Sequence, residues 1–258
     1  MAGFSNYWRN KAVSHLFGKE VYTPSATKYV GLSLSDPGRD GLGVLEPTGG
    51  GYSRVSASSD VWGLASGGTI RNASAIQFVA TGSWGTVSYF VVYDSPTGGN
   101  LLCYGTVTPI AITVGTWEFA IGAMSVTLTL PNYIRDQILN HMFGKATYTA
   151  PASYYLGMSS SDPLVDGSGL TEPVGGGYGR VTNDSGDWDD VSGGETLNVN
   201  PLVCNKATDS QGIMTYYVIF DSPTENNMLV YGGLSEPLVV AQNNAVTFSV
   251  GKLSASIM

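Results

Sequence analysis

Two nearly identical glycine-rich stretches, EPTGGGYSRV at residues 46–55 and EPVGGGYGRV at residues 172–181, are the first candidates for chemistry. Three consecutive glycines can present backbone N–H groups to a phosphate, and a basic residue, Arg54 or Arg180, follows them. A phosphate-binding P-loop also needs a lysine and then Ser or Thr directly after its last glycine, with a helix behind them. Both stretches lack that lysine and continue as extended sequence. We therefore interpret them as turns that lead into strands, and we predict no nucleotide or other cofactor.

The charged residues around these turns predict structural ion pairs. A guanidinium and a carboxylate form short, charge-assisted hydrogen bonds, and each turn has one arginine close to two acidic residues. The candidate partners are Glu46 and Asp36 for Arg54, and Glu172 and Asp162 for Arg180.

The acidic stretch at residues 162–167 is similar to the start of a calcium-binding loop, because Asp stands at the first and fifth places and Gly at the sixth. Such a loop needs an oxygen ligand at its third place and a glutamate at its twelfth, where this chain has Leu164 and Pro173. Asp-Pro and Asp-Gly pairs are ordinary turn sequences. No metal site is predicted, and a different coordination geometry is kept as the alternative.

Histidine and cysteine are too scarce for the usual nucleophilic or zinc sites. The chain has two of each, and neither Cys103 nor Cys204 has a counterpart 126 or 127 positions away. We interpret the cysteines as buried free thiols, and His15 and His141 as helix-end residues that complement the helix dipole. Asp and Glu are numerous, but no spacing singles out a catalytic pair. The protein is therefore predicted not to be an enzyme.

Tryptophan side chains offer a stacking surface for sugars or for a partner protein. Trp62 and Trp188 lie 126 positions apart, whereas Trp84 has no counterpart. Burial in a core is the more frequent use of such side chains. An interface or glycan contact of these three residues is kept as the alternative to core packing.

The chain is a tandem duplication. HLFGK at residues 15–19 recurs as HMFGK at 141–145, and SDP at 35–37 recurs at 161–163, both with an offset of 126. The offset becomes 127 at DSPT, residues 94–97 and 221–224. A period of this length is the size of a small domain. We predict two domains, residues 1–130 and 131–258, which are joined without a Gly/Ser linker and so are held in a fixed relation.

Each copy is predicted to begin with one helix, because apolar residues recur four positions apart. The apolar face contains Trp8, Ala12 and Leu16 in copy one, and Ile134, Ile138 and Met142 in copy two. The candidate N-caps are Ser5 or Asn6 and Asn132, and the candidate helix-ending glycines are Gly18 and Gly144.

The remaining sequence of each copy predicts short strands and turns. Strand-like segments lie at residues 30–35, 87–93, 101–104, 117–121 and 126–130 of copy one, and at 215–220, 228–231 and 246–250 of copy two. About six to eight short strands per copy are typical of a sandwich. The predicted fold is mainly β: two tandem β-sandwich, jelly-roll-like domains, each preceded by one N-terminal α-helix.

Composition and charge exclude several classes of function. Charged residues make up 12% of the chain and the formal net charge is −8, without any run of Lys or Arg. Binding of nucleic acid would need a basic surface, so none is predicted. No apolar run approaches the length of a membrane span, and the N-terminus lacks the basic start of a signal peptide. We expect neither membrane insertion nor a cleaved signal.

The glycine-rich stretches belong to a longer motif, Ser-x-x-Asp-Pro-x-x-Asp-Gly-x-Gly-x-x-Glu-Pro-x-Gly-Gly-Gly-Tyr-x-Arg-Val, at residues 33–55 and 159–181. This motif resembles a family of virion proteins of tailed bacteriophages, the tail-fibre or minor tail proteins. The resemblance covers nearly all of copy one and weakens in copy two after Gly194, where Gln211 stands in place of Trp84. It implies a non-enzymatic β-sandwich subunit that acts as an oligomer, and it brings no catalytic residue.

Residues and resemblance together favour a structural virion protein, either a minor tail or tail-fibre subunit or a capsid-decorating (cement) subunit. Its expected partners are other virion proteins of the capsid or tail and further copies of the chain, for example in a trimer. It is expected to be made in the host cytoplasm and to reside in the virion. The main alternative is a host-receptor or glycan-binding module of the tail, and a glycan hydrolase is a weaker third.

Overall fold

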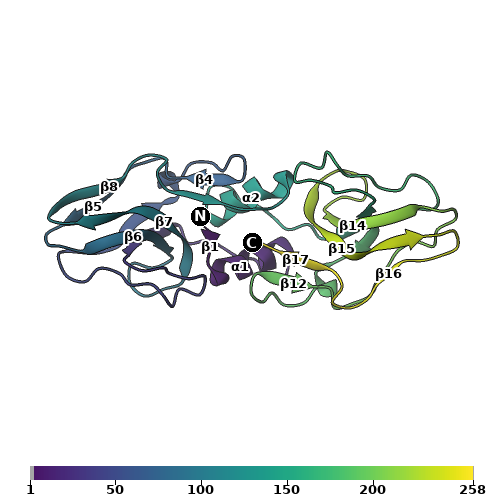
Figure 1. The fold of residues 1–258 in the computed structure, drawn as a ribbon, viewed down its shortest axis with the longest axis horizontal. Helices are drawn as coiled ribbons and strands as arrows, with labels where there is room; N and C mark the ends of the chain where they lie inside the picture. Colours follow the sequence, from purple (N-terminus) through teal and green to yellow (C-terminus); the bar gives the residue numbers. More distant parts are fainter. Residues whose placement is uncertain (1–2, 258) are drawn as a thin grey trace.

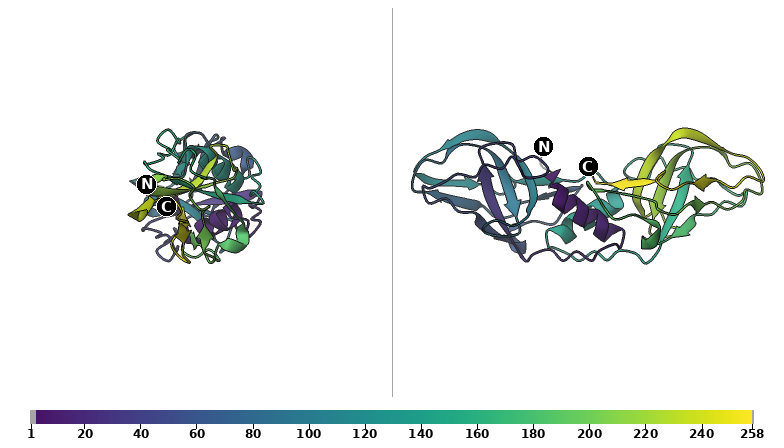
Figure 2. Two further views of the ribbon diagram at one scale, coloured as in Figure 1. Left: turned by 90° about the vertical axis from the view of Figure 1, so that its right-hand side faces the viewer. Right: turned by 90° about the horizontal axis from the view of Figure 1, so that it is seen from below.

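The molecule is elongated, with a β-rich body at each end and two helices between the bodies (Figure 1). The computed structural model describes residues 3–257. One sequence copy builds each body, and both ends of the described chain lie at the centre, beside the helices (Figure 2).

Apart from β1, which occurs in copy one alone among the described residues, the two copies share one order of elements. Copy one contains β1 (Gly3–Phe4), α1 (Asn6–Leu16), β2 (Thr27–Ser33), β3 (Val55–Ser58), the 3₁₀ turn η1 (Ser59–Val61), β4 (Thr69–Arg71), β5 (Ile76–Ala80), β6 (Gly85–Tyr93), β7 (Leu101–Ile112), β8 (Gly115–Phe119) and β9 (Ser125–Thr127). Copy two contains α2 (Asn132–Met142), β10 (Tyr154–Ser159), β11 (Val181–Asn183), η2 (Ser185–Asp187), β12 (Glu195–Leu197), β13 (Leu202–Val203), β14 (Gly212–Phe220), β15 (Met228–Val240), β16 (Thr247–Phe248) and β17 (Ser254–Ser256).

Each body is built on one antiparallel sheet. The strand order is β1-β7-β6-β2-β3 in copy one and β11-β10-β14-β15 in copy two. In copy one the β5–β8 pair forms a second layer, in which the Phe119 ring lies 6.0 Å from the Phe90 ring of the main sheet. The β13–β16 pair occupies the matching place in copy two. The predicted fold class is confirmed: the chain is mainly β, with two tandem β-rich domains that each follow an N-terminal helix.

The two helices begin differently. Ser5, one of the two predicted candidates, is the N-cap of α1, and its Oγ accepts a hydrogen bond from the Trp8 N–H at 3.2 Å. The prediction for α2 was wrong, because Pro131 takes the cap position and Asn132 is the first helical residue. A proline loses little at a helix start, where backbone N–H groups have no partner in the helix. Gly18 and Gly144 follow the helices in the left-handed region, at φ +63° and +72°, and end them as predicted.

Some strand boundaries differ from the sequence prediction. The strands β7 and β15 continue to Ile112 and Val240, well beyond the predicted ends at residues 104 and 231. Their outer halves contain glycine and proline and are largely exposed, so the sequence shows no alternation there. Residues 128–130 are not a strand but connect β9 to α2.

The helices join the two bodies into one buried core. Helix α1 contacts β12 of copy two, and α2 contacts β4 of copy one. Phe143, which follows α2, packs with its ring centre 4.7 Å from that of Trp62 in copy one. Phe17, which follows α1, packs at the same distance from Trp188 in copy two. Each body therefore completes its core with a side chain from the other copy, and one cluster of buried residues runs through both.

Candidate functional site

All three nitrogens of the Arg54 guanidinium donate hydrogen bonds to groups of copy one. Its Nε donates to Oε1 of Glu46 at 3.0 Å, and its Nη2 donates to Oε2 at 2.7 Å. Its Nη1 donates to the carbonyls of Ser95 and Gly98. The guanidinium carbon also lies 3.4 Å from the centre of the Tyr93 ring, a cation–π contact. The side chain therefore fastens the loop after β6 to the glycine-rich turn.

Arg180 repeats this arrangement in copy two. It forms a 2.6 Å ion pair with Glu172 and lies 3.4 Å from the centre of the Phe220 ring. Its Nη1 donates to the carbonyls of Ser222 and Glu225. Because both arginines are fully occupied within their own copies, neither is free to bind a ligand.

A tyrosine completes each ion pair. The Tyr52 hydroxyl donates to Oε1 of Glu46 at 2.7 Å and accepts a hydrogen bond from the Leu32 N–H at 2.9 Å. Burial raises the pKa of Tyr52 far above its ordinary value, and the hydrogen bond to Glu46 raises it further, so the phenol stays protonated. A Cβ on Gly31 would lie 2.7 Å from the Glu46 carboxylate, which explains the glycine within β2.

The three glycines form a left-handed turn. Gly49, Gly50 and Gly51 have φ values of +74°, +54° and +73°, a conformation that other residues adopt only at a cost. The Gly50 carbonyl points at Trp84, whose indole N–H donates to it at 2.9 Å. In copy two, Gln211 Nε2 donates to the matching carbonyl of Gly176 at the same distance. Gln211 therefore takes over the hydrogen bond of Trp84, although the two residues differ in size and chemistry.

The three candidate tryptophans lie in the core. Trp62, Trp84 and Trp188 are 0%, 4% and 1% exposed. Trp62 and Trp188 pack on phenylalanines that follow the helices, and Trp84 packs edge-on against Tyr52 at 5.2 Å. None of these rings presents a face on which a sugar could stack.

The acidic candidates Asp36 and Asp162 serve as turn residues. Asp36 accepts a hydrogen bond from the Gly38 N–H, and Asp162 accepts one from the Leu164 N–H, both at 3.0 Å. These are local turns of the kind that Asp favours. Within residues 3–257, no group of three or more His, Cys, Asp or Glu side chains is arranged to hold a metal ion.

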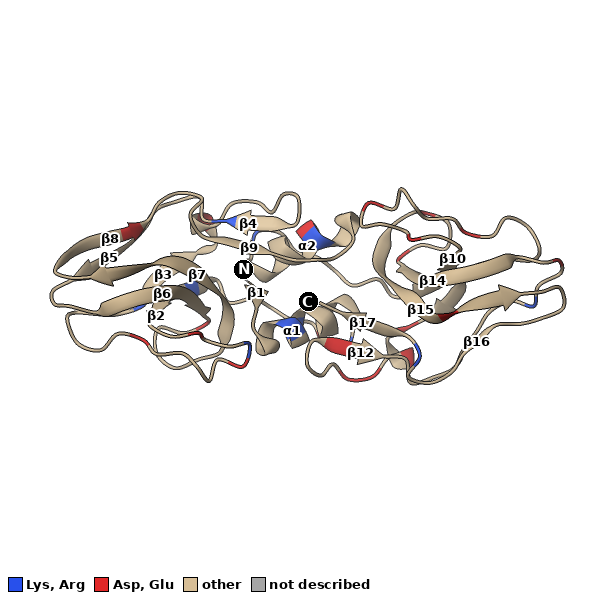
Figure 3. Ribbon diagram, viewed as in Figure 1, with Lys and Arg blue, Asp and Glu red and all other residues tan. Residues whose placement is uncertain are grey.

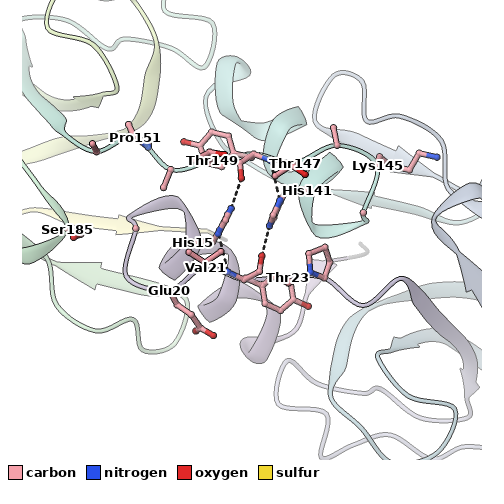
Figure 4. A pocket seen from close by; sticks show the side chains of 18 residues that line it. His15, Glu20, Val21, Thr23, His141, Lys145, Thr147, Thr149, Pro151 and Ser185 are labelled. Atoms are coloured by element: carbon pink, nitrogen blue, oxygen red, sulfur yellow. Dashed lines mark hydrogen bonds between the residues drawn. The ribbon is translucent and has the colours of Figure 1, made fainter.

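A groove of about 610 Å³ lies between the two copies, and its lining comes from both (Figure 4). The rings of His15 and His141 stack in it, with centres 4.0 Å apart and planes 6° apart. His15 Nε2 bonds to the Tyr148 carbonyl, and His141 Nε2 to the Tyr22 carbonyl, each at 2.9 Å. Each histidine thus binds the loop of the other copy.

The second nitrogen of each ring fixes its protonation. The Tyr22 N–H donates to His15 Nδ1 at 3.2 Å, and the Tyr148 N–H donates to His141 Nδ1 at 3.3 Å. An acceptor nitrogen carries no proton, so both rings are neutral with the proton on Nε2. Burial lowers the pKa of His141, and the neighbouring His15 lowers it further. The arrangement has an approximate two-fold symmetry that relates one copy to the other.

Further side chains cross between the copies in the same symmetric manner. Lys19 donates to the carbonyls of Ser185 and Trp188, and Lys145 donates to the Ser59 carbonyl. On the helices, Asn10 Oδ1 accepts from the Gly194 N–H at 2.6 Å. Asp136, the equivalent residue of α2, accepts hydrogen bonds from the N–H groups of Gly67 and Gly68 in copy one.

Sequence reasoning missed the histidine pair. It placed both residues at helix ends, which is correct, but assigned them to the helix dipole alone. The available signal was that the two histidines of the chain lie at equivalent positions, 126 apart, so a symmetric packing of the copies could bring them together. Both cysteines are buried and free, as predicted, and burial raises the pKa of the Cys204 thiol to about 11.

Lys and Arg residues are distributed over both bodies and both helices rather than gathered in one region of the ribbon (Figure 3). No helix within residues 3–257 is long and apolar enough to cross a bilayer. The sequence model of the family described as Podophage GP4 fiber I protein gp80 matches the chain twice, over residues 3–129 and 129–256. A search of curated proteins gave no match.

Proposed function

Because the chain belongs to the family of the podophage GP4 fiber I protein gp80, we propose that it is a non-enzymatic structural subunit of a phage fibre that packs on other virion proteins. The observation that carries this proposal is the core shared by the two copies. A subunit that transmits load or sets a distance needs its parts to be held rigidly, and burial of large aromatic side chains across the junction provides this.

The two sequence copies, residues 1–130 and 131–258, are proposed to act as the two lobes of one unit. Phe143 in the core of copy one and Phe17 in the core of copy two tie the lobes together. The central position of both helices leaves the outer ends of the two bodies free for contacts (Figure 1).

Exposed apolar side chains support packing against neighbours. In copy one, Val79 on β5 is 62% exposed and Val114, between β7 and β8, is 72% exposed. In copy two, Val239 at the end of β15 is 64% exposed. Contacts of these residues with other virion proteins or with further copies of the chain, as in a trimer, would remove apolar surface from water.

A capsid-decorating role is the second form of the same proposal, since it needs the same packing surfaces. The glycan-binding alternative would need residues other than Trp62, Trp84 and Trp188, because these rings are buried.

The deciding experiment is electron microscopy of intact particles that carry a compact tag on this chain. We expect tag density on the fibres. Density over the head shell would instead establish the decorating role, and particles without any tag density would refute a place in the virion.

A further inference from the structure

The His15–His141 pair closes the junction between the copies with four hydrogen bonds, and the two that Nδ1 accepts depend on neutral rings. Both Nε2–H groups donate to carbonyls of the opposite copy, and both Nδ1 atoms accept backbone N–H groups. The side chains are 4% and 5% exposed, yet both line the open groove, so water and protons can reach them.

A proton on either Nδ1 would convert an acceptor into a donor and set it against a backbone N–H that has no other partner in this arrangement. Protonation of both rings would also place two positive charges in a stack with a 4.0 Å spacing. Like charges this close disfavour the charged form strongly.

The Tyr22 carbonyl that accepts from His141 Nε2 favours a charged ring, but the side chains around the stack offer little to neutralise such charges. Tyr22 and Tyr148 contact the rings from the two loops, and burial raises the pKa of both phenols, so they remain neutral. Lys28 on β2 adds positive charge near His141, and Lys145 adds it at the groove. Among the groove-lining residues the carboxylate is Glu20, which is already paired with Lys11 at 2.5 Å.

We propose that the stacked histidines form an acid-sensitive latch: at neutral pH they hold the loop at residues 20–24 to the loop at 146–152, and protonation releases these loops and loosens the junction. This proposal depends only on contacts within the chain. It therefore does not depend on where in a virion the protein lies.

The direction of the pH effect follows from linkage. The pKa of His141 is lowered in the closed junction, so the open state binds protons more readily. The latch is therefore fully effective above the ordinary histidine pKa of about 6.5 and weakens as the pH falls below that value.

The first test is a titration of the full-length chain by NMR of its imidazole signals, which come from two histidines alone. We expect His141 to titrate below its ordinary pKa of about 6.5. In the variant His15→Gln, the His141 ring should titrate at a higher pH than in the unsubstituted protein, because the neighbouring ring that lowers its pKa is gone. A His141 titration near the ordinary value, unchanged by this substitution, would overturn the proposal.

A second measurement needs no variant. Hydrogen exchange of the Tyr22 and Tyr148 amides, corrected for intrinsic rates, should lose about tenfold in protection for each pH unit between the ordinary histidine pKa of about 6.5 and the lowered closed-state pKa. The amides of the β5–β8 pair, remote from the histidines, serve as the internal control. Equal changes in both regions would indicate global acid unfolding and contradict a latch, as would unchanged protection of the two tyrosine amides at pH 5.

Discussion

Trp188 donates its indole N–H to Oδ1 of Asn183, 2.8 Å away, and both side chains are buried. Within residues 3–257, the indole N–H of the equivalent Trp62 has no hydrogen-bond partner, because Ala57 stands where copy two has Asn183. The two tryptophans fill equivalent places in the core but differ by one hydrogen bond.

This difference predicts unequal effects of the same substitution. Trp188→Phe should destabilise the protein by about 1–2 kcal/mol more than Trp62→Phe, since it leaves the buried Asn183 without its donor. Chemical unfolding of both variants measures the difference. Equal losses would show that the hydrogen bond contributes nothing to stability.

Arg54 should not tolerate replacement by lysine. Lysine keeps the charge but loses the two-point pairing with Glu46 and the stacking on Tyr93, so we expect Arg54→Lys to cost about 1–3 kcal/mol. Arg180→Lys should behave alike, because Arg180 makes the equivalent contacts with Glu172 and the Phe220 ring. The control is Arg39→Lys at an exposed position, where the expected change is within about 0.5 kcal/mol. A loss at Arg39 as large as at Arg54 would contradict the assignment.

The junction can be tested at two neighbouring glycines. Gly193 and Gly194 both have left-handed φ values, +62° and +78°, so alanine is unfavourable at either. A Cβ at Gly193 would meet open space, whereas one at Gly194 would lie 2.6 Å from Arg9 Nε of the other copy. We expect Gly194→Ala to lower the free energy of unfolding by roughly 1–3 kcal/mol more than Gly193→Ala. Thermal unfolding of the pair would show this, and equal melting temperatures would mean that the helix contact is dispensable.

The buried Lys28 is expected to make the stability of the fold depend on pH. Its side chain is 1% exposed, and burial lowers its pKa to about 8, whereas the unfolded chain keeps this lysine protonated to about pH 10.5. Below pH 8 the folded protein carries the cost of a buried charge, and between pH 8 and 10.5 its stability gains as the proton is lost.

Lys28→Met should therefore raise the free energy of unfolding at pH 7 by about 1–3 kcal/mol, and this gain should shrink as the pH rises toward 10.5. Copy two already has an uncharged residue, Tyr154, at this place. Urea unfolding across this pH range is the measurement, with Lys206→Met at an exposed position as the control. A gain independent of pH would show that the charge of Lys28 is not its cause.

The sequence was sufficient for elements that depend on local patterns. The helices follow from apolar residues four apart, and the turns follow from glycines whose left-handed conformation other residues disfavour. The pairing of Glu46 with Arg54 could be named but not separated from pairing with Asp36, because both acids are near in sequence and the choice depends on strand register.

The packing of the two copies against each other could not be predicted from local sequence patterns. Phe17 and Phe143 look like the apolar ends of their own helices, yet they pack in the opposite bodies. A repeat predicts that two copies exist, but not that each completes the core of the other. The hydrogen bond of Trp84 could not be predicted for a related reason: Trp84 has no tryptophan counterpart, and nothing in the sequence shows that Gln211 makes the same hydrogen bond with a smaller side chain.

The approximate symmetry of the junction has a consequence for how the molecule can be oriented. If two identical chains paired around the histidine stack, the two outer ends of the dimer would be identical. Such a dimer would have no polarity along its long axis. Joining the copies in one chain allows the ends to differ: residues 113–114 connect β7 to β8 at the end of one body, whereas residues 241–246 connect β15 to β16 at the end of the other. The protein thereby has polarity, so that each end can select a different neighbour.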